Sequence, residues 1–487
     1  MFIGDFSGRS RPDACPGALQ VHAAADGGLA RIRVPGGRLT SSQLRELADA
    51  ASACGSGVIE LTSRANVQVR GLGADGGHAN GDSTGGDLTD TDFADGGFAA
   101  RMAAAGLLPS ATHERVRNIL ASPLTGCDGR GMLDVSPLVS DLDRRLCGTP
   151  ALAGLPGRFL FAFDDGRGDV AWLDPDAGIL PTGPGEAALI LAGTDSGLRV
   201  PIGSAVTALL AAAEAFLAEP EVRRARAWRI GELPGCAERI AVRVAVRVGS
   251  AVGAGRTSPL LPRAQAPTGW EPVGILGEPE GPAVLGVAVP LGRLTSAQAG
   301  LLADLASPAG VRLTPWRGVV LPGLTPAEAA GAAALAGKVG LVVDPGSPWT
   351  GVTACTGRPG CAKSLADVRA DATRAMSATM STDMSTDTTA AMSTDTTVDV
   401  TIDVTIDVAA GVAAPAVTAP DAAGSPRTGT LPVHWAGCER RCGRPRGRVA
   451  DVVATAAGYR IDLDGRSLNC ADIEETTAVV TALRGET

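Results

Sequence analysis

The chain has 487 residues, which is long enough for two to four domains that each bury a core. Hydrophobic residues make up 45% of it and aromatic residues only 3%, so we expect aliphatic cores and few stacking platforms for nucleic-acid bases. The net charge of −9 also argues against a nucleic-acid partner, which needs a basic face, although a local basic pocket is compatible with it.

The N-terminal sequence and the cysteine content indicate the compartment. The first residues, MFIGDFSGRSRPDACPG, lack the apolar region of a signal peptide, and no run of about eighteen apolar residues predicts a membrane span. Ten cysteines in such a chain favour thiols or metal ligands over a disulfide framework. We therefore expect a soluble cytoplasmic protein without a membrane partner.

An internal repeat begins close to the N-terminus. The segment RIRVPGGRLTSSQLRELADAA at 31–51 resembles GVAVPLGRLTSAQAGLLADLA at 286–306. Each copy predicts a strand, a glycine turn, a helix and a second strand. In the first copy a cap at Thr40 precedes Leu44 and Leu47, which follow helical spacing. Two half-domains of this kind are expected to pack face to face about a pseudo-twofold axis.

The two copies differ in their basic residues. Arg31 and Arg33 lie two residues apart on the first strand, so their side chains share one face. The second copy has Gly286 and Ala288 at these positions. Adjacent guanidinium groups either stay solvated or hold an anion. Four further arginines follow in the same half: Arg64, Arg70, Arg115 and Arg117. They favour anion binding, with the first half carrying the chemistry and the second serving as a scaffold.

Two segments are poor in core-forming residues. Residues 73–97 are rich in Gly and Asp and predict an exposed loop. Residues 376–426 repeat STD and VTID motifs and predict a disordered insertion. The VTID repeats, which begin at 400 and 404, have the alternative of pairing locally as strands.

Four cysteines flank the second of these segments in two pairs. Cys355 and Cys361 have five residues between them, and Cys438 and Cys442 have three. Four thiolates in two pairs bind either zinc or a [4Fe–4S] cluster. Structural zinc sites favour gaps of two to four residues, so the longer first gap favours the cluster. The glycines in and beside both pairs allow the sharp loops that wrap it.

The cysteine pattern and the duplicated PGG-x-LT segment together resemble the sirohaem-dependent sulfite/nitrite reductase superfamily. Within it the chain is most similar to the precorrin-3B synthase family, through the stretches RPDACPGALQVHAAADGGLARIRVPGG, ELTSRANVQVRGL, HERVRNILASPLTG, ACTGRPGCAKSLADVRADA and VHWAGCERRCGRP. The resemblance implies an α+β fold of duplicated ferredoxin-like half-domains packed about a pseudo-twofold, plus two α+β nitrite/sulfite-reductase-like domains. The boundaries we expect are 1–110 and 262–345 for the half-domains, and 111–245 and 346–487 for the α+β domains, the last of which carries the iron–sulfur site.

The resemblance also implies roles for individual residues. Cys355, Cys361, Cys438 and Cys442 would ligate a [4Fe–4S] cluster, and in the reductases the cysteine at the last position also bridges to sirohaem iron. Arg31, Arg33 and Arg117 are expected to be catalytic, and Arg64, Arg70, Arg115 and Arg158 to bind the substrate. The reductases use two lysines in a segment like LP-x-K-F-K. Here it reads LPGRFL, with Arg158 at the first lysine position and Leu160 at the second. That departure puts sulfite or nitrite reduction in doubt.

The activity implied by the resemblance is an oxidation of precorrin-3A. Dioxygen and a reductant hydroxylate the macrocycle at C20, and a ring A acetate closes to a γ-lactone, in aerobic cobalamin biosynthesis. The family is thought to use a second iron centre, for which the sequence shows no ligand pair. No G-x-G-x-x-G fingerprint follows a strand, so NADH is expected to deliver electrons through a separate reductase. The alternatives are a sirohaem-dependent sulfite or nitrite reductase, and a non-catalytic metal-binding module.

The remaining histidines and cysteines are expected to be structural. His113 opens the HERVRN motif and His434 precedes the second cysteine pair, but neither has a partner at ligand spacing. Cys15 lies in a predicted loop, where packing or loop shaping is favoured over catalysis. The other cysteines are isolated in aliphatic stretches, as buried thiols often are: Cys54, Cys127, Cys147, Cys236 and Cys470.

Overall fold

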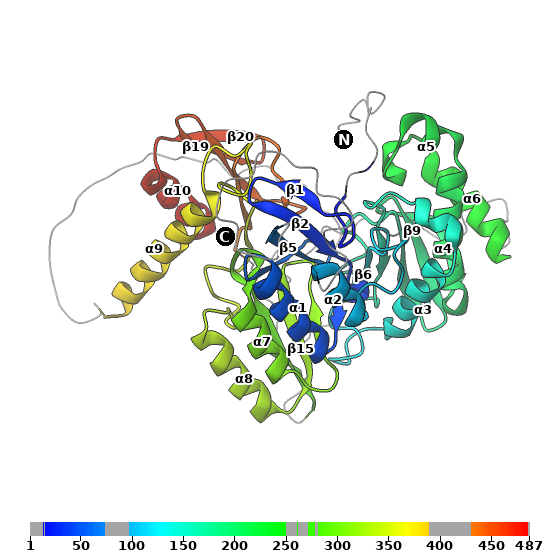
Figure 1. Ribbon diagram of the computed structural model, residues 1–487, viewed down its shortest axis with the longest axis horizontal. Coiled ribbons are helices and arrows are strands. Elements are labelled where there is room, and N and C mark those ends of the chain that lie inside the picture. The colour runs from blue at the N-terminus through cyan, green and yellow to red at the C-terminus, as the bar shows by residue number, and fades with distance from the viewer. Residues whose placement is uncertain are drawn as a thin grey trace, which may run out of the picture.

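The computed structural model describes residues 13, 15–73, 97–249, 261, 271–277, 281–388 and 430–485. Within them lie four five-stranded sheets with helices packed on them, which confirms the predicted α+β class (Figure 1). Most of the predicted Gly/Asp-rich loop and both VTID repeats lie outside the described residues. No helix in the described ranges combines the length and the apolarity that crossing a bilayer requires.

The first half-domain follows the predicted order of strand, turn, helix and strand. Its elements are β1 (His22–Ala24), β2 (Gly27–Ile32), β3 (Arg38–Leu39), α1 (Ser41–Cys54), β4 (Val58–Leu61), β5 (Val67–Leu72) and the additional α2 (Phe98–Ala104). Thr40 caps α1 as predicted. Its side chain accepts from the backbone N–H of Gln43, and the Gln43 side chain accepts from the Thr40 N–H.

The second half-domain repeats this order. It consists of β11 (Gly274–Leu276), β12 (Ala283–Ala288), β13 (Arg293–Thr295), α7 (Ser296–Leu305), β14 (Val311–Leu313), β15 (Gly318–Leu324) and α8 (Pro326–Lys338). Thr295 and Gln298 form the same capping box as Thr40 and Gln43. Local sequence alone therefore specifies where both helices begin.

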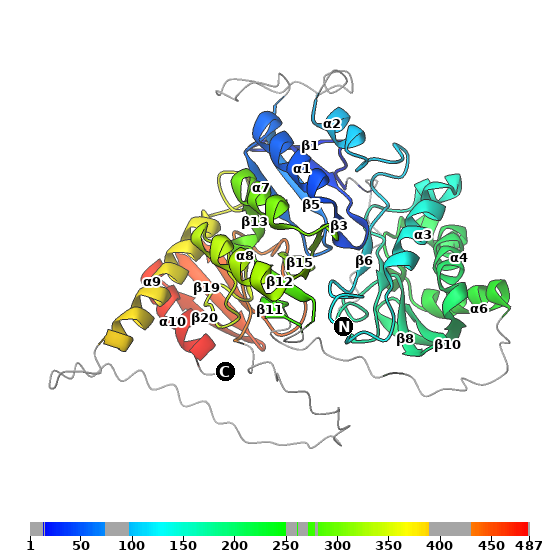
Figure 2. The ribbon, with the colours of Figure 1, turned by 90° about the horizontal axis from the view of Figure 1, so that it is seen from below.

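The two halves exchange short strands. β13 of the second half pairs with β4 of the first, and β3 of the first pairs with β14 of the second, giving the orders β1-β2-β5-β4-β13 and β11-β12-β15-β14-β3. Helices α1 and α7 lie side by side (Figure 2). Leu44 and Leu47 of α1 share one core with Leu294 and Leu302 of the second half. The predicted pseudo-twofold pairing is confirmed, and each sheet is incomplete without the other half.

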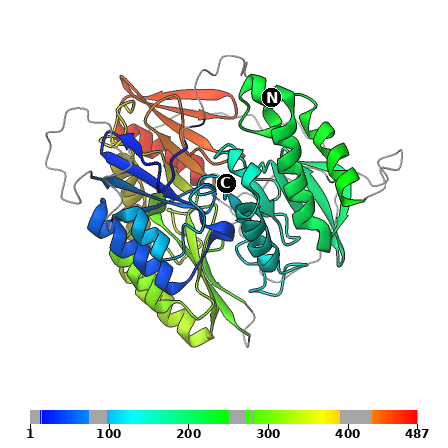
Figure 3. The ribbon, with the colours of Figure 1, turned by 45° about the vertical axis from the view of Figure 1, so that its right-hand side comes forward.

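The part of the chain between the two half-domains, from β6 to α6, is called the second unit here. It lies beside both halves (Figure 3). It contains β6 (Ile119–Ala121), α3 (Ser136–Cys147), β7 (Phe161–Phe163), β8 (Ala177–Gly183), β9 (Glu186–Leu191), β10 (Thr194–Pro201), α4 (Ala205–Ala218), α5 (Pro220–Ala225) and α6 (Cys236–Val248). Its strands take the order β10-β9-β8-β7-β6, and α3, α4 and α6 cover an aliphatic core with a small aromatic centre at Phe159, Phe161 and Phe216.

The fourth unit, which follows the second half-domain in the chain, carries both cysteine pairs. It contains β16 (Val352–Ala354), α9 (Val368–Thr388), β17 (Val433–Ala436), β18 (Ala450–Thr455), β19 (Gly458–Leu463), β20 (Arg466–Cys470) and α10 (Ile473–Gly485). β16 and β17 are parallel neighbours, so the loops that follow them leave the same edge of the sheet. These are the loops of Cys355–Cys361 and Cys438–Cys442.

The prediction that a disordered insertion starts at residue 376 is wrong. Helix α9 continues through its first residues to Thr388, and Met376 is 1% exposed in the core of the fourth unit. The Thr379 hydroxyl also lies 3.2 Å from that of Thr481 on α10. Composition suggested disorder because Ser, Thr and Asp are poor helix formers, but packing against α10 overrides that weak preference.

Candidate active site

One face of the first sheet is polar. Along β2, β4 and β5 the apolar residues point to the α1 side and enter the core, as Ile32, Ile59 and Val67 do. Alternation therefore sends the residues between them to the opposite face. Those residues are Arg31, Arg33, Glu60, Gln68 and Arg70, with Arg293 continuing the row on β13. As the sequence predicts, Arg31 and Arg33 share a face.

Arg33 is the most constrained residue of this face. It is 2% exposed, and its Nε donates to the Arg115 carbonyl at 3.1 Å. Its two terminal nitrogens are buried without any hydrogen-bond partner. Burial, and then the positive charge of Arg31, lower the pKa of Arg33 to about 9. A guanidinium held in this way is stabilised by an anion that accepts from both free nitrogens.

Further groups surround Arg33. Burial and then Arg229 lower the pKa of Arg64 to about 10, and Arg31 adds to that shift. Burial also lowers the pKa of Arg31, and the charge of Arg158 lowers it further. The structure thus brings together four predicted site residues, Arg31, Arg33, Arg64 and Arg158, which we call the arginine group.

A wall formed by Trp228 and Arg229 of the second unit lies beside the arginine group. Arg158 lies over the Trp228 ring with 4.8 Å to the ring centroid. The neighbouring Arg229 forms an ion pair with Asp176, whose carboxylate is wholly buried. Sequence reasoning missed Trp228 and Arg229, because they lie some seventy residues beyond Arg158 and belong to no recognisable motif.

Cys15 also belongs to this region. Its thiol interacts electrostatically with Arg31, Arg33 and Arg64, and its Cβ lies where a side chain on Gly157 would have to sit. Burial and then the charge of Asp13 raise the pKa of the Cys15 thiol. The sequence predicts loop shaping for Cys15, and the tertiary structure adds that its thiol lies near the arginine group.

The four thiols of Cys355, Cys361, Cys438 and Cys442 lie in one place. Burial raises the pKa of the Cys442 thiol, and the other three cysteines of the set each raise it further. The backbone N–H of Gly437 donates to the Cys355 sulfur at 3.2 Å. A side chain at Gly437 would collide with Ser364 Oγ at 1.8 Å, so the second loop can approach the first only with glycine there.

Zinc and a four-iron cluster require different spacings of the four thiols. Zinc holds thiolates at about 2.3 Å, which places the sulfur atoms roughly 3.8 Å apart in a tetrahedron. In the described part of the chain, the residues that gather three potential metal-ligand atoms within 4.8 Å are Asp164, Asp165 and Asp169, not the cysteines. A four-iron cluster sets its thiolates further apart than zinc does, because it offers one iron to each of them. The four thiols, with the N–H bond to the Cys355 sulfur, could hold the predicted [4Fe–4S] cluster.

Two polar residues link the half-domains to the cysteine loops. Arg317 of the second half donates to the Gly443 carbonyl at 2.6 Å, next to Cys442. His434 is wholly buried, and its Nδ1 lies 2.9 Å from the Thr353 hydroxyl. Burial and then Arg317 lower the pKa of His434 to about 3, so the ring is neutral at pH 7. The second half-domain therefore takes part in the site and is more than a scaffold.

The structure does not bring Arg117 to the arginine group. Its guanidinium makes a bidentate pair with Asp143 at 2.7 and 2.8 Å, and Nη1 donates to the Leu107 carbonyl. These bonds hold α3 against the preceding loop and engage all three guanidinium nitrogens, so the group is bound to the protein itself. The expected catalytic role of Arg117 has no support in this geometry.

Arg70 and Arg115 also donate hydrogen bonds to other groups of the protein. Arg70 pairs with Asp26 and donates to the Gly360 carbonyl at 2.8 Å, so it supports the first cysteine loop rather than a substrate. Arg115 donates to the Asp13 carbonyl, and its own carbonyl accepts from Arg33. Both lie beside the site and position its parts.

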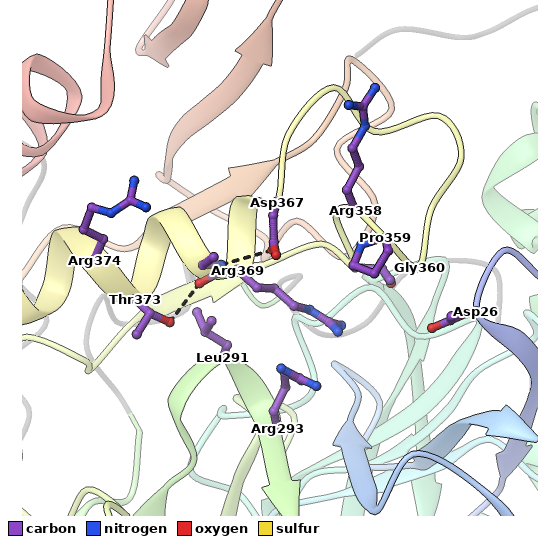
Figure 4. A pocket seen from close by; sticks show the side chains of 12 residues that line it. Asp26, Leu291, Arg293, Arg358, Pro359, Gly360, Asp367, Arg369, Thr373 and Arg374 are labelled. Carbon is purple, nitrogen blue, oxygen red and sulfur yellow. Dashed lines mark hydrogen bonds between the residues drawn. The ribbon is translucent and has the colours of Figure 1, made fainter. Parts of the chain in front are cut away.

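A cavity of about 570 Å³ opens on the other side of the first cysteine loop (Figure 4). Arg293 and Arg369 extend into the same space, and Arg358, Pro359 and Gly360 of the loop form one side of it. Arg369 is held by an ion pair to Glu60 at 2.6 Å and by a bond to the Cys355 carbonyl at 3.2 Å. The polar face of the first sheet therefore runs from the arginine group to this cavity.

The fold and the two groups of residues can now be compared with known proteins. The family model of the nitrite/sulfite reductase ferredoxin-like half domain matches residues 22–75 and 277–339, the two exchanged halves. The NirA protein of Mycobacterium tuberculosis has the same fold, with a TM-score of 0.65 and 20% identity over 93% of this chain and 79% of that one. The expected resemblance to the nitrite/sulfite reductase superfamily is confirmed.

Among proteins of assigned function, the chain is similar to a precorrin-3B synthase of Sinorhizobium sp. The two are 24% identical over 462 residues, which cover 93% of this chain and 83% of the relative. A ferredoxin–nitrite reductase of Synechococcus elongatus is 30% identical over 145 residues, but these span only 28% of this chain and 25% of the reductase. Both relatives are oxidoreductase-type enzymes.

Proposed function

We propose that the protein is a precorrin-3B synthase, which hydroxylates precorrin-3A at C20 with dioxygen and closes a ring A acetate to a γ-lactone. Each turnover would consume one O2 and two electrons from a donor; one oxygen atom enters the macrocycle and the other leaves as water. The similarity over 93% of the chain to a precorrin-3B synthase supports this substrate class.

The observation that carries the proposal is the pair of buried, unpartnered nitrogens on Arg33. Precorrin-3A carries many carboxylates, and a carboxylate can accept from both nitrogens at once. Arg31, Arg64 and Arg158 surround that position, so several carboxylates of one macrocycle would each find a cation. Trp228 beside Arg158 offers an aromatic face at the edge of the same site.

The cysteine loops would hold the electron relay of this reaction. Cys355, Cys361, Cys438 and Cys442 are the residues that would hold a [4Fe–4S] cluster, which supplies one-electron transfer when bound. Gly437 donates to one of these sulfurs, and Arg317 fixes the loop after Cys442. These contacts define what the chain contributes: it shapes the loops and places positive charge around them.

Leu160 favours the synthase over a sirohaem reductase. It stands where the reductases have their second lysine, and it is 3% exposed in the shared core of the half-domains. An apolar core residue supplies neither charge nor protons for a multi-electron reduction of an oxyanion. The nitrite reductase similarity is confined to about a quarter of each chain, which lends the alternative less support.

The test is incubation of anaerobically purified protein with precorrin-3A, O2 and a reductant, followed by mass spectrometry of the tetrapyrrole. We expect one added oxygen atom, labelled when 18O2 is used. The absorption spectrum of the same preparation should show a broad band near 400 nm that dithionite bleaches. Sharp sirohaem bands with nitrite or sulfite turnover would establish the reductase instead, and a colourless zinc protein would exclude both enzymes.

A further inference from the structure

Glu60 is a buried acid on a face made otherwise of arginines and one glutamine. It lies on β4, is 7% exposed, and its Oε1 forms the ion pair with Arg369 at 2.6 Å. Its other oxygen, Oε2, accepts from Gln68 Nε2 on the adjacent strand β5. Burying a carboxylate is costly unless both oxygens are satisfied, and here two different partners satisfy them.

These contacts belong to a continuous chain of hydrogen bonds. Arg31 Nη2 donates to Gln68 Oε1 at 2.9 Å, and Gln68 in turn donates to Glu60. Beyond the Glu60–Arg369 pair, Arg369 Nε donates to the carbonyl oxygen of Cys355. The chain therefore starts at a member of the arginine group and ends on the backbone of a cysteine-loop residue.

Strand register produces the first part of this chain. Arg31 faces Gln68 directly across the β2–β5 pair, and Gln68 faces Glu60 across the β5–β4 pair. Side chains directly opposite on one face lie within contact distance. Gln68 suits the central position, because its amide accepts from a cation on one side and donates to a carboxylate on the other.

The second half-domain lacks the equivalent chain. The matching row on its sheet contains Gly286, Val320 and Arg312, joined by the same pattern of register. Arg312 donates instead to the carbonyls of Pro123 and Thr125 in the second unit. Because the second half keeps the same strands with Gly286 and Val320 in place of Arg31 and Gln68, the chain of bonds in the first half is not a requirement of the half-domain fold.

We infer that Glu60 and Gln68 are positioning residues that couple occupancy of the arginine group to the surroundings of the cysteine-bound cluster. This inference rests on the proposed function. A carboxylate that binds Arg31 competes with Gln68 for its Nη2. Gln68 and Glu60 then readjust, and with them the Arg369 bond to the Cys355 carbonyl. Hydrogen bonds and charges around an iron–sulfur cluster set its reduction potential, so substrate binding would change that potential.

The experiment measures the midpoint potential of the cluster by EPR-monitored titration, with and without saturating uroporphyrin III as an eight-carboxylate tetrapyrrole probe. In the unmodified protein we expect the probe to lower the potential, since added negative charge disfavours reduction. The Gln68→Leu variant interrupts the chain between Arg31 and Glu60. We expect it to bind the probe within threefold of the original affinity and to lose at least half of the potential shift.

Two further variants sharpen the result. Glu60→Gln removes a buried negative charge and should raise the resting potential as well as reduce the shift. Gln298→Leu makes the same replacement as Gln68→Leu in the exposed capping box of α7, outside the chain of bonds from Arg31 to Cys355, and should match the unmodified protein.

The outcomes distinguish the coupling from the proposed function. A full potential shift in Gln68→Leu, with unchanged probe affinity, would overturn the coupling and leave the proposed function standing. Failure of the unmodified protein to hold a cluster or to bind the probe would overturn the proposed function, and the coupling with it. A diminished shift in Gln68→Leu alone, with Gln298→Leu normal, supports the coupling.

Discussion

At the scale of single residues, Arg33 and Arg117 show how two equally buried guanidiniums take different roles. Both are less than 5% exposed. Each guanidinium nitrogen of Arg117 has a partner in Asp143 or a carbonyl, whereas Arg33 leaves its two terminal nitrogens without one. A saturated buried arginine stabilises the fold, while an unsatisfied one weakens it until an anion arrives.

The matched substitutions Arg33→Met and Arg117→Met test this difference. Arg33→Met should lower affinity for an eight-carboxylate tetrapyrrole at least tenfold and leave the stability of the ligand-free protein unchanged or higher. Arg117→Met leaves Asp143 without its ion-pair partner and should lower the free energy of unfolding by about 3 kcal/mol. Tetrapyrrole binding should be retained below the melting temperature of this variant. Denaturant titration and fluorescence quenching measure the two effects. Equal losses of binding in both variants would contradict the assignment.

Asp169 is a second buried group with an unsatisfied atom. Its Oδ1 accepts from the Ser122 hydroxyl, and its Oδ2 has no partner. Burial, and then the charge of Asp164, raise the pKa of Asp169 well above its usual value. Asp164 itself already accepts four backbone N–H bonds. Its lone pairs are therefore occupied, and we assign this acidic group to loop structure rather than to a cation.

Asp169→Asn should stabilise the protein above neutral pH. The folded state keeps a proton on Asp169 that the unfolded chain releases near pH 4, so the stability from this group falls as the pH rises through the raised pKa. The slope is at most about 1.4 kcal/mol per pH unit. Melting temperatures of variant and original should agree at pH 4 and separate at pH 8. Asp165→Asn, which breaks an ion pair with Arg167, should instead destabilise at pH 8.

At the scale of secondary-structure elements, the strand exchange between the half-domains depends on close backbone approach. Gly37 precedes β3 with a φ of 69°, and a Cβ there would lie 2.3 Å from the Leu313 carbonyl on β14. Gly310 makes the corresponding approach to the Leu39 carbonyl, also at 2.3 Å. Both approaches belong to the β3–β14 pair, so these two glycines let the first half insert β3 into the sheet of the second.

Gly37→Ala should therefore disrupt the exchange. The left-handed conformation alone costs an alanine about 1–2 kcal/mol, and the collision with the carbonyl adds to it. Gly57→Ala is a matched control, because Gly57 has a φ of 71° but nothing within 4 Å of its Cβ position. Chemical denaturation should show a clearly larger loss for Gly37→Ala; similar losses would mean that the close approach is unimportant.

At the scale of the whole molecule, four parts of the chain meet at the site, and the second half-domain contributes Arg317, which donates to the Gly443 carbonyl beside Cys442. The first half-domain contributes the polar face, the second unit contributes Arg158 and the Trp228–Arg229 wall, and the fourth unit contributes the thiols. The positive charge gathers there although the chain carries a net charge of −9. An anionic macrocycle would therefore bind where arginines of the first half-domain and of the second unit lie close together.

Tetrapyrrole binding should stabilise the assembled molecule. At a free concentration one hundred times the Kd, ligand binding adds about 2.7 kcal/mol to the folded state. Differential scanning fluorimetry with uroporphyrin III should show a rise in melting temperature that high salt reduces. The octamethyl ester of the same macrocycle lacks the charges and should produce no rise. An equal rise with the ester would indicate apolar rather than ionic recognition.

Local sequence determined the features that depend on near neighbours. The capping boxes at Thr40 and Thr295, the shared face of Arg31 and Arg33, and the duplicated half-domains follow from short-range patterns. The pairing of the two cysteine loops followed from spacing and from the family resemblance. Composition failed at the start of α9, because burial of Met376 against the fourth unit is a long-range contact.

Only the tertiary structure decided which charged groups meet. Glu60, Gln68 and Arg369 are ordinary residues in the sequence, and their chain of bonds exists because strand register and α9 bring them together. Arg117 looked like Arg33 in the sequence, yet α3 supplies Asp143 to one and nothing to the other. Periodicity and capping act over a few residues and can be read from the sequence, whereas the partner of a buried charge is chosen by elements that fold against it from elsewhere in the chain.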